Sequence, residues 1–177
     1  MNKKILAFGA SNSSTSINKQ LAQYAASLFK KADVELLDLN DYEMPIYSID
    51  REKKEGFPQL AHDFYKKIGD ADFILISFAE HNGNFSTAFK NILDWMSRIN
   101  SKTFQEKPML LLATSPGARG GSSVLDIAVK RMPFQGGMVK GSFSLPVFND
   151  NFDKEKGRIS NAALNEDLLK IVNSIEL

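Results

Sequence analysis

The chain has 177 residues, 43% of them hydrophobic and 24% charged, which is the composition of a globular protein large enough for a sizeable core. Its 22 basic and 21 acidic residues nearly cancel, and this balance excludes a global electrostatic attraction to nucleic acid or to a membrane surface. The absence of cysteine excludes disulfides and thiolate chemistry, and two separated histidines, His62 and His81, are too few for a zinc centre.

Every long apolar run is too short to cross a membrane or to act as an export signal. Residues 5–10 fall below the ~7–15 residues of a signal-peptide core, and residues 73–79 and 109–113 fall below the ~20 residues of a membrane-spanning helix. The lack of cysteine also fits a reducing compartment. We therefore expect a soluble cytoplasmic protein with one domain over residues 1–177, and with neither nucleic-acid nor membrane partners.

In chain order, apolar runs typical of strands buried on both faces alternate with segments of helical periodicity. The predicted strands cover residues 5–8, 34–39, 73–78, 108–114 and 138–147. The predicted helices cover residues 18–30, 57–70, 85–99, 122–132 and 160–175. Residues 40–57 are predicted to be a long loop, Gly141 to bend the fifth strand, and Ser160 to cap the last helix. This alternation predicts an α/β fold with a parallel sheet covered by helices on both faces.

Ligands of such folds bind beyond the carboxyl ends of the strands. Three loops follow the first, third and fourth predicted strands, at residues 9–18, 79–87 and 115–121. All three loops are rich in serine, asparagine or glycine. We therefore expect the ligand site where these three loops meet.

The first loop has the composition of a phosphate site without a cation. Ser11, Ser13, Ser16 and Asn18 supply hydroxyl and amide donors just before a predicted helix, whose N-terminus favours an anion. No lysine or arginine lies between Ile5 and Asn18, which favours a nucleotide-like cofactor. Ser16 or Asn18 as a simple helix cap is the alternative, and it is compatible with phosphate binding. The loop has neither the lysine of a P-loop nor the glycine spacing of the dinucleotide fingerprint.

The second loop, residues 79–84, can flank a planar ring with the His81 imidazole and bind it through Asn82 and backbone amides. The alternative has three parts. Residues 82–83 are then an ordinary tight turn, His81 is a surface residue, and Glu80 is a charge at a helix N-terminus. The residues of this loop leave both interpretations open.

The third loop, residues 115–121, contains Ser115 and three glycines, Gly117, Gly120 and Gly121. Glycine lets a ligand approach the backbone closely, although a turn followed by a helix start also explains this composition. Arg119 in the same loop is either a solvated surface charge or a contact for the phosphate of a nicotinamide nucleotide.

Three short motifs, in this order, resemble those of the NADPH-dependent FMN reductase family, flavodoxin-like proteins that include quinone, azo and chromate reductases. The family motif G-S-x-R-x-x-S-x-N is matched at Ser11, Ser16 and Asn18. The family motif P-E-Y-N is matched at Glu80 and Asn82, followed by a helix whose end, near residues 93–95, is like K-N-A-I-D-W. The family motif G-x-x-G-G is matched by residues 117–121.

This chain departs from those motifs at three positions. Ser13 stands where the family has an arginine, so one charge-assisted phosphate contact is lost. His81 replaces the family tyrosine, and Ala79 replaces the family proline. The hydroxyls and amides that this chain retains still suit FMN.

The resemblance implies a flavodoxin-like three-layer sandwich with a five-stranded parallel sheet in the order 2-1-3-4-5. It also implies an FMN-dependent oxidoreductase that takes hydride from NADPH or NADH and reduces a quinone, an azo compound, a flavin or a similar small-molecule electron acceptor. The flavin carries the chemistry, so neither a catalytic side chain nor a metal is expected. A homodimer or homotetramer is implied as well. The alternative is a flavodoxin-like electron carrier that binds FMN without nicotinamide turnover. The cofactor-binding residues implied are Ser11, Ser13, Ser16, Ile17, Asn18, Ala79, Glu80, His81, Asn82, Ser115, Gly117, Gly120 and Gly121.

Overall fold

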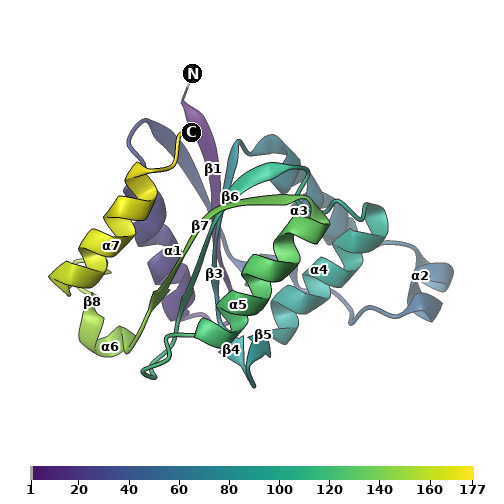
Figure 1. The fold of residues 1–177 in the computed structure, drawn as a ribbon. Helices are drawn as coiled ribbons and strands as arrows, with labels where there is room; N and C mark the ends of the chain where they lie inside the picture. The colour runs from purple at the N-terminus through teal and green to yellow at the C-terminus, as the bar shows by residue number, and fades with distance from the viewer. Residues whose placement is uncertain (1) are drawn as a thin grey trace.

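The computed structural model describes residues 2–177 and contains one sheet of five parallel strands (Figure 1). The spatial order is β2-β1-β3-β6-β7, which confirms the predicted order 2-1-3-4-5. The strands are β1 (Lys3–Ala10), β2 (Ala32–Leu37), β3 (Phe73–Phe78), β6 (Lys107–Thr114) and β7 (Gly137–Leu145).

Burial differs between the centre and the edges of this sheet. Every residue of β3 is buried, and β1 and β6 are buried from their third residue onward, as expected for apolar runs between two helical layers. The edge strands β2 and β7 keep several residues exposed. The prediction that all five strands are buried on both faces is therefore wrong for the two edges, because an edge strand has only one neighbour and less helical cover.

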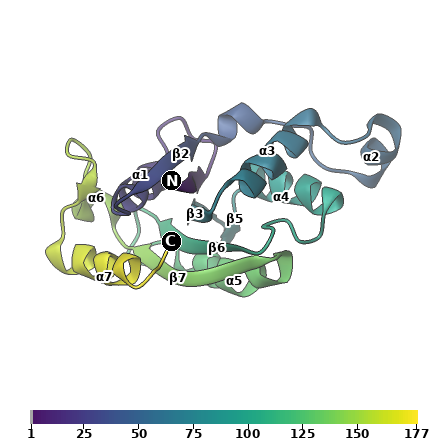
Figure 2. The same ribbon diagram turned by 90° about the horizontal axis from the view of Figure 1, so that it is seen from above.

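Five helices form the outer layers. Helices α1 (Ile17–Ser27) and α7 (Ala162–Asn173) cover one face of the sheet. Helices α3 (Gln59–Asp70), α4 (Thr87–Ile99) and α5 (Ser122–Arg131) cover the other (Figures 1 and 2). Each helix turns its apolar stripe inward. On the three-helix face Phe8 packs edge-to-face on Phe64, with ring centroids 5.3 Å apart.

Several short elements lie where the sequence predicts only loop. The segment 40–57 contains a 3-10 turn, η1 (Leu39–Tyr42), and helix α2 (Ile49–Glu55), which buries none of its residues and therefore shows no apolar period. The last helix is capped by Asn161, whose side chain accepts from the Leu164 N–H, and not by Ser160. The remaining short elements are β4 (Glu80–His81), β5 (Asn84–Phe85), η2 (Met132–Gln135), α6 (Phe148–Asn151), β8 (Phe152–Asp153) and β9 (Arg158–Ile159).

The bend predicted at Gly141 is present. The register between β6 and β7 shifts between Met109 and Leu110, so that Gly141 faces Leu110. A Cβ added at Gly141 would lie 2.6 Å from Cγ2 of Ile171 on α7. The glycine therefore lets α7 pack directly on the irregular part of β7.

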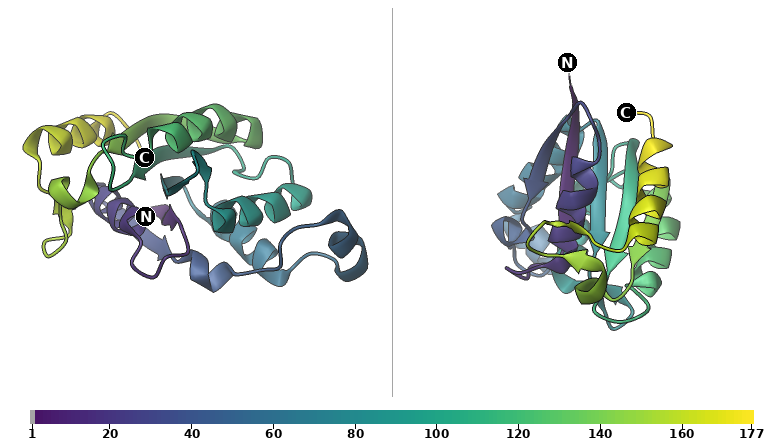
Figure 3. Two further views of the ribbon diagram at one scale, coloured as in Figure 1. Left: turned by 90° about the horizontal axis from the view of Figure 1, so that it is seen from below. Right: turned by 90° about the vertical axis from the view of Figure 1, so that its left-hand side faces the viewer.

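All five strands of the sheet run in the same direction, so their carboxyl ends gather at one edge, the lower one in Figure 1. The left panel of Figure 3 looks onto this edge, and its right panel shows the strands side by side, with α1 and α7 in front of them. The two ends of the described chain lie at the opposite edge (Figure 1). None of the helices within residues 2–177 combines the length and the apolar character that a bilayer crossing requires.

Candidate functional site

The three loops singled out in the sequence meet at the carboxyl edge of the sheet. They enclose a cavity of about 260 Å³, here called the first cavity. The predicted residues that line it are Ser11, Ser13, Ser16, Ile17, Asn18, Ala79, Glu80, His81 and Ser115. Asn82 lines a neighbouring cavity, and Gly117, Gly120 and Gly121 line neither of the two.

The first loop turns tightly so that its polar groups surround the start of α1. Ser13 N–H donates to the Ser11 hydroxyl at 3.2 Å, and Ser16 N–H donates to the Ser13 carbonyl at 3.1 Å. Ser16 caps α1, because its Oγ accepts from the Lys19 N–H at 3.1 Å, and its own O–H is left to donate. The backbone N–H groups of Ile17 and Asn18 belong to the first turn, where a helix has no internal acceptor for them. These groups form an anion site of helix-terminus type.

Close packing of β1 against α1 creates this geometry. A Cβ added at Gly9 would lie 2.4 Å from the Lys19 backbone nitrogen. Real Cβ atoms do not come so close to a backbone atom, so a larger residue at this position would push the helix N-terminus away from the strand. The glycine therefore sets the distance between the end of the strand and the start of the helix.

The side chain of Asn18 has a structural part in the site. Its Nδ2 donates to the Thr114 carbonyl at 3.1 Å, and its Oδ1 accepts from the Thr114 N–H at 3.1 Å. The same oxygen accepts from the Ser77 hydroxyl at 2.7 Å. The amide thus pairs with Thr114 as a neighbouring strand would, and ties α1 to β3 and β6. Because these bonds occupy the side chain, the part of Asn18 left for a ligand is its backbone N–H.

Lys19, which follows the first loop in sequence, is paired with a carboxylate outside this loop. Lys19 Nζ lies 2.5 Å from Oδ2 of Asp38, and this hydrogen bond, with that from the Asn40 backbone, lowers the pKa of the Asp38 carboxyl below its usual range. Within residues 2–177, no lysine or arginine lines the first cavity. An anion bound there is therefore held by neutral donors and by the helix dipole.

The second loop is a two-residue hairpin between β4 and β5. His81 pairs with Asn84, and the two residues between them, Asn82 and Gly83, have φ values of 52° and 75°. Positive φ at both positions is the signature of a type I′ turn, and asparagine-glycine is its favoured sequence. The tight-turn interpretation of these two residues is confirmed. The hairpin exposes His81 at the cavity edge.

Glu80 connects the second loop to the third. The N-cap residue of helix α5 is Gly121, whose φ of 76° lies in the left-handed region and which has no side chain to cap the helix. Oε2 of Glu80 accepts instead from the Val124 N–H at 3.1 Å. The interpretation of Glu80 as a charge at a helix N-terminus is therefore confirmed, and the helix is α5. The carboxylate fixes the two loops relative to each other.

The third loop is anchored through its backbone. The Gly117 carbonyl accepts from the N–H groups of Gly120 and Val147, at 3.1 Å and 3.0 Å. The Ser115 carbonyl accepts from the Phe148 N–H at 3.1 Å. These bonds hold the loop against the start of α6. Arg119 donates to the Ser123 hydroxyl at 2.7 Å on the surface, and it lines neither cavity.

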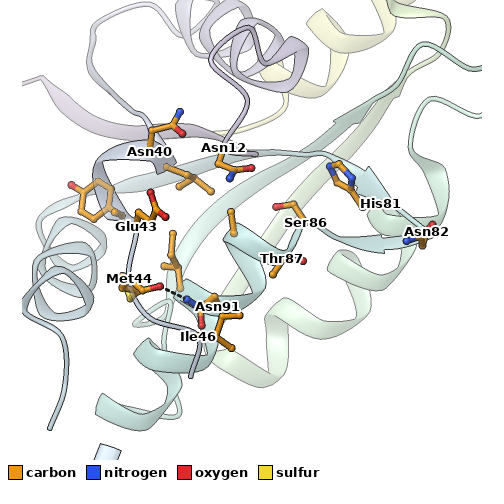
Figure 4. Close-up of a pocket in the computed structure, with 14 residues that line it drawn as sticks. Asn12, Asn40, Glu43, Met44, Ile46, His81, Asn82, Ser86, Thr87 and Asn91 are labelled. Atoms are coloured by element: carbon orange, nitrogen blue, oxygen red, sulfur yellow. Dashed lines mark hydrogen bonds between the residues drawn. The ribbon is translucent and has the colours of Figure 1, made fainter. Parts of the chain in front are cut away.

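A second cavity, of about 410 Å³, adjoins the first, and His81 lines both. Figure 4 shows it between the segment that follows β2 and the first turns of α4. His81 and Asn82 lie at one end in this view, and Glu43 and Met44 at the other. Residues 2–177 contribute no lysine or arginine to its lining either.

Several lining residues could not be singled out from the sequence. Thr114 and Pro116 of the first cavity flank the predicted strand end, so the rule that ligands bind at carboxyl ends was the available signal. The polar lining of the second cavity includes Asn12, Asn40 and Asn91, which are dispersed over 80 positions of the chain and form no motif. No cluster of histidine, cysteine, aspartate or glutamate suited to a metal occurs in the described part of the chain.

The chain is similar in sequence to several known proteins. The sequence model of the family described as NADPH-dependent FMN reductase matches residues 3–150. A Mycoplasma pneumoniae protein described as uncharacterized is 31% identical over 158 residues, which cover 86% of this chain and 93% of that protein. A 2-hydroxy-1,4-benzoquinone reductase of Burkholderia is 35% identical, over 67% of this chain and 69% of that enzyme. An Escherichia coli quinone reductase is 30% identical, over 55% of this chain and 58% of its own length.

Among solved structures, the flavoenzyme NAD(P)H:acceptor oxidoreductase FerB of Paracoccus denitrificans superposes with a TM-score of 0.78 at 20% identity. The superposition covers 97% of this chain and 94% of that one, and it confirms the flavodoxin-like fold. The family match confirms the predicted oxidoreductase class and the predicted cofactor types, FMN and NAD(P)H. The chain belongs to the NADPH-dependent FMN reductase family.

Proposed function

We propose that this protein uses FMN bound in the first cavity to transfer electrons from NADH or NADPH to a small acceptor such as a quinone, an azo compound or another flavin. One observation carries the proposal. Three loops at the carboxyl edge of the sheet place hydroxyls and free helix N–H groups around one cavity, as a phosphorylated cofactor requires.

The phosphate end of the cofactor fits the first loop. The hydroxyls of Ser11, Ser13 and Ser16 and the N–H groups of Ile17 and Asn18 converge at the N-terminus of α1. A helix N-terminus carries roughly half a positive charge, which favours a dianion even without a cationic side chain. Lys19, the lysine of this turn, forms an ion pair with Asp38.

The second and third loops would bind the ring end of FMN. Bound FMN would supply the redox chemistry, accepting a hydride and passing electrons on. Ala79, Glu80, His81 and Asn82 would border the ring from one side through their backbone groups and the imidazole. Ser115 and the glycines at 117, 120 and 121 would border it from the other. The Glu80 bond to α5 keeps these two borders at a fixed separation, so the ring position is set before the cofactor enters.

Exposed apolar side chains support the proposed homodimer or homotetramer. Ile46 is 70% exposed, and Ile49 and Phe57 are 45% and 38% exposed, all on the segment between η1 and α3. Large apolar side chains left exposed on one segment are common at interfaces. Analytical ultracentrifugation of the wild type and of Ile46→Asp tests it, because a monomeric wild type would contradict the proposal. The cytoplasmic location stays a prediction.

The purified protein provides the direct test of the cofactor. We expect a yellow protein that releases FMN on denaturation and loses its visible absorbance when NADH or NADPH is added without oxygen. Bound FMN without this bleaching would favour the electron-carrier alternative. A protein that binds no added FMN would contradict both.

A pair of variants tests the phosphate site. Removing one hydroxyl, in Ser11→Ala or in Ser16→Ala, should weaken FMN binding by roughly tenfold to a hundredfold, since a hydrogen bond to a charged group contributes about 1.5–3 kcal/mol. Riboflavin, which lacks the phosphate, should bind as it does to the wild type. Ser27→Ala, at the far end of α1, is the matched control. An equal loss for both flavins would contradict the assignment.

A further inference from the structure

The second cavity lies beside the proposed cofactor site, and the side chain of His81 lines both. Its volume of about 410 Å³ is within the range of small-molecule sites. A molecule bound in it would adjoin the cofactor across a single side chain. This placement suits the second substrate of an electron-transfer reaction.

The wall of this cavity formed by residues 43–46 is held in a fixed position by α4. Nδ2 of Asn91 donates to the carbonyls of Met44 and Pro45, at 3.0 Å and 3.2 Å, and its Oδ1 accepts from the Tyr47 N–H at 2.8 Å. Nε1 of Trp95 donates to the same Pro45 carbonyl at 2.7 Å. The cavity is therefore formed before a ligand arrives, which lowers the entropic cost of binding.

The polar groups of this lining favour a neutral ring that carries carbonyl or hydroxyl groups. The amides of Asn12, Asn40 and Asn82 can donate to a carbonyl or accept from a hydroxyl. Apolar side chains, among them Met44 and Ile46, supply contact surface for the ring itself.

Within residues 2–177, the lining of the second cavity includes one carboxylate, that of Glu43, and neither lysine nor arginine to offset it. Glu43 is exposed at the end of the cavity opposite His81 (Figure 4). Among residues 2–177 it takes part in none of the ion pairs. An anionic ligand would meet this charge directly, and a like charge at about 4 Å costs roughly a factor of five in affinity even in water.

We propose that the second cavity binds the electron acceptor, and that Glu43 makes it select neutral quinones over anionic ones. The inference rests on the proposed function. The overall reaction balances as one reduced nicotinamide, one quinone and one proton from water giving one oxidised nicotinamide and one hydroquinone. The chain's own contribution is to hold a neutral ring beside the cofactor site and to repel a charged one.

The experiment compares a neutral quinone, p-benzoquinone, with its sulfonate. For the wild-type FMN-loaded protein we expect kcat/KM at least about fivefold higher for the neutral quinone. Glu43→Gln should remove most of this preference, and Glu43→Lys should reverse it. The matched control is Asp41→Asn. Asp41 carries the same charge two positions before Glu43 but does not line the cavity, so this variant should keep the wild-type preference.

Binding without turnover provides the second readout. Hydroquinone and hydroquinone sulfonate, titrated by calorimetry into the oxidised protein, should show the same preference and the same response to Glu43→Lys. If neither NADH nor NADPH bleaches the wild type without oxygen, the proposed function fails. If bleaching is normal but the Glu43 variants leave the ratio between the two quinones unchanged, the acceptor inference alone is overturned. If the Glu43 variants instead change the ratio between the rates with NADH and with NADPH, the cavity is assigned to the nicotinamide. That result overturns the acceptor inference as well.

Discussion

Replacing Asn18 with alanine should destabilise the protein strongly, even without cofactor. The side chain is 3% exposed and makes three hydrogen bonds, two to the Thr114 backbone and one to Ser77. The alanine variant leaves the two Thr114 groups without partners, and they cannot turn away because β6 is paired with β7 on its other side. A buried polar group left without a partner costs about 1–3 kcal/mol.

We expect the free energy of unfolding to fall by about 3 kcal/mol, which corresponds to roughly 6–12 °C in Tm for a chain of this size. Urea unfolding followed by circular dichroism, on the cofactor-free protein, measures it. The control is Asn12→Ala, an exposed asparagine of the same loop, which should change stability by less than about 0.5 kcal/mol.

The variant Asn18→Asp separates the hydrogen-bond argument from a simple packing effect. Aspartate has the same shape, but its ionised carboxylate cannot donate to the Thr114 carbonyl. Burial should raise the pKa of this carboxyl in the folded state, so the variant should regain stability as the pH falls and the proton is restored. A loss below about 1 kcal/mol for the alanine variant, or an aspartate variant indifferent to pH between about 7 and 5, would refute the reasoning.

Three further predictions concern the loops around the first cavity. Ser13→Arg should tighten FMN about tenfold by adding a charge-assisted contact, with riboflavin unchanged and Ser14→Arg as the control; fluorescence titration measures both. Glu80→Ala should lower the stability measured by thermal unfolding by about 1 kcal/mol, because α5 loses its cap. Glu80→Gln should retain most of this stability, and equal losses for the two variants would contradict the capping role. The depressed pKa of Asp38 means that its bond to Lys19 stabilises the fold above the unfolded pKa and is lost as the pH falls through the folded one. Between about pH 5 and pH 3 the stability of Asp38→Asn should therefore decline less than that of the wild type, and parallel curves would argue against it.

The strands of the sheet could be predicted because they depend on local apolar patterns. Apolar runs such as residues 73–78 are buried as expected, and the resemblance supplied the strand order. The lower burial of the edge strands could not be predicted in this way, since the exposure of β2 and β7 follows from their position in the sheet and not from their own composition.

Within the site, the residue types could be predicted, but the particular hydrogen bonds that each residue makes could not. Asn18 bonds to a residue 96 positions away, and Glu80 to one 44 positions away. Neither contact leaves a trace in a short window of sequence. The second cavity escaped prediction for a related reason. Its walls come from an exposed connection and the side of a helix, where asparagines are unremarkable until the fold brings them together.

The separation between the ends of the described chain and the ligand edge has a practical consequence. Because both ends emerge from the amino side of the sheet, a polypeptide or a chemical tether joined there would extend away from the loops (Figure 1). The protein can thus be attached to an electrode, a bead or a second enzyme with its ligand edge turned outward. Redox partners in solution would then reach it unhindered.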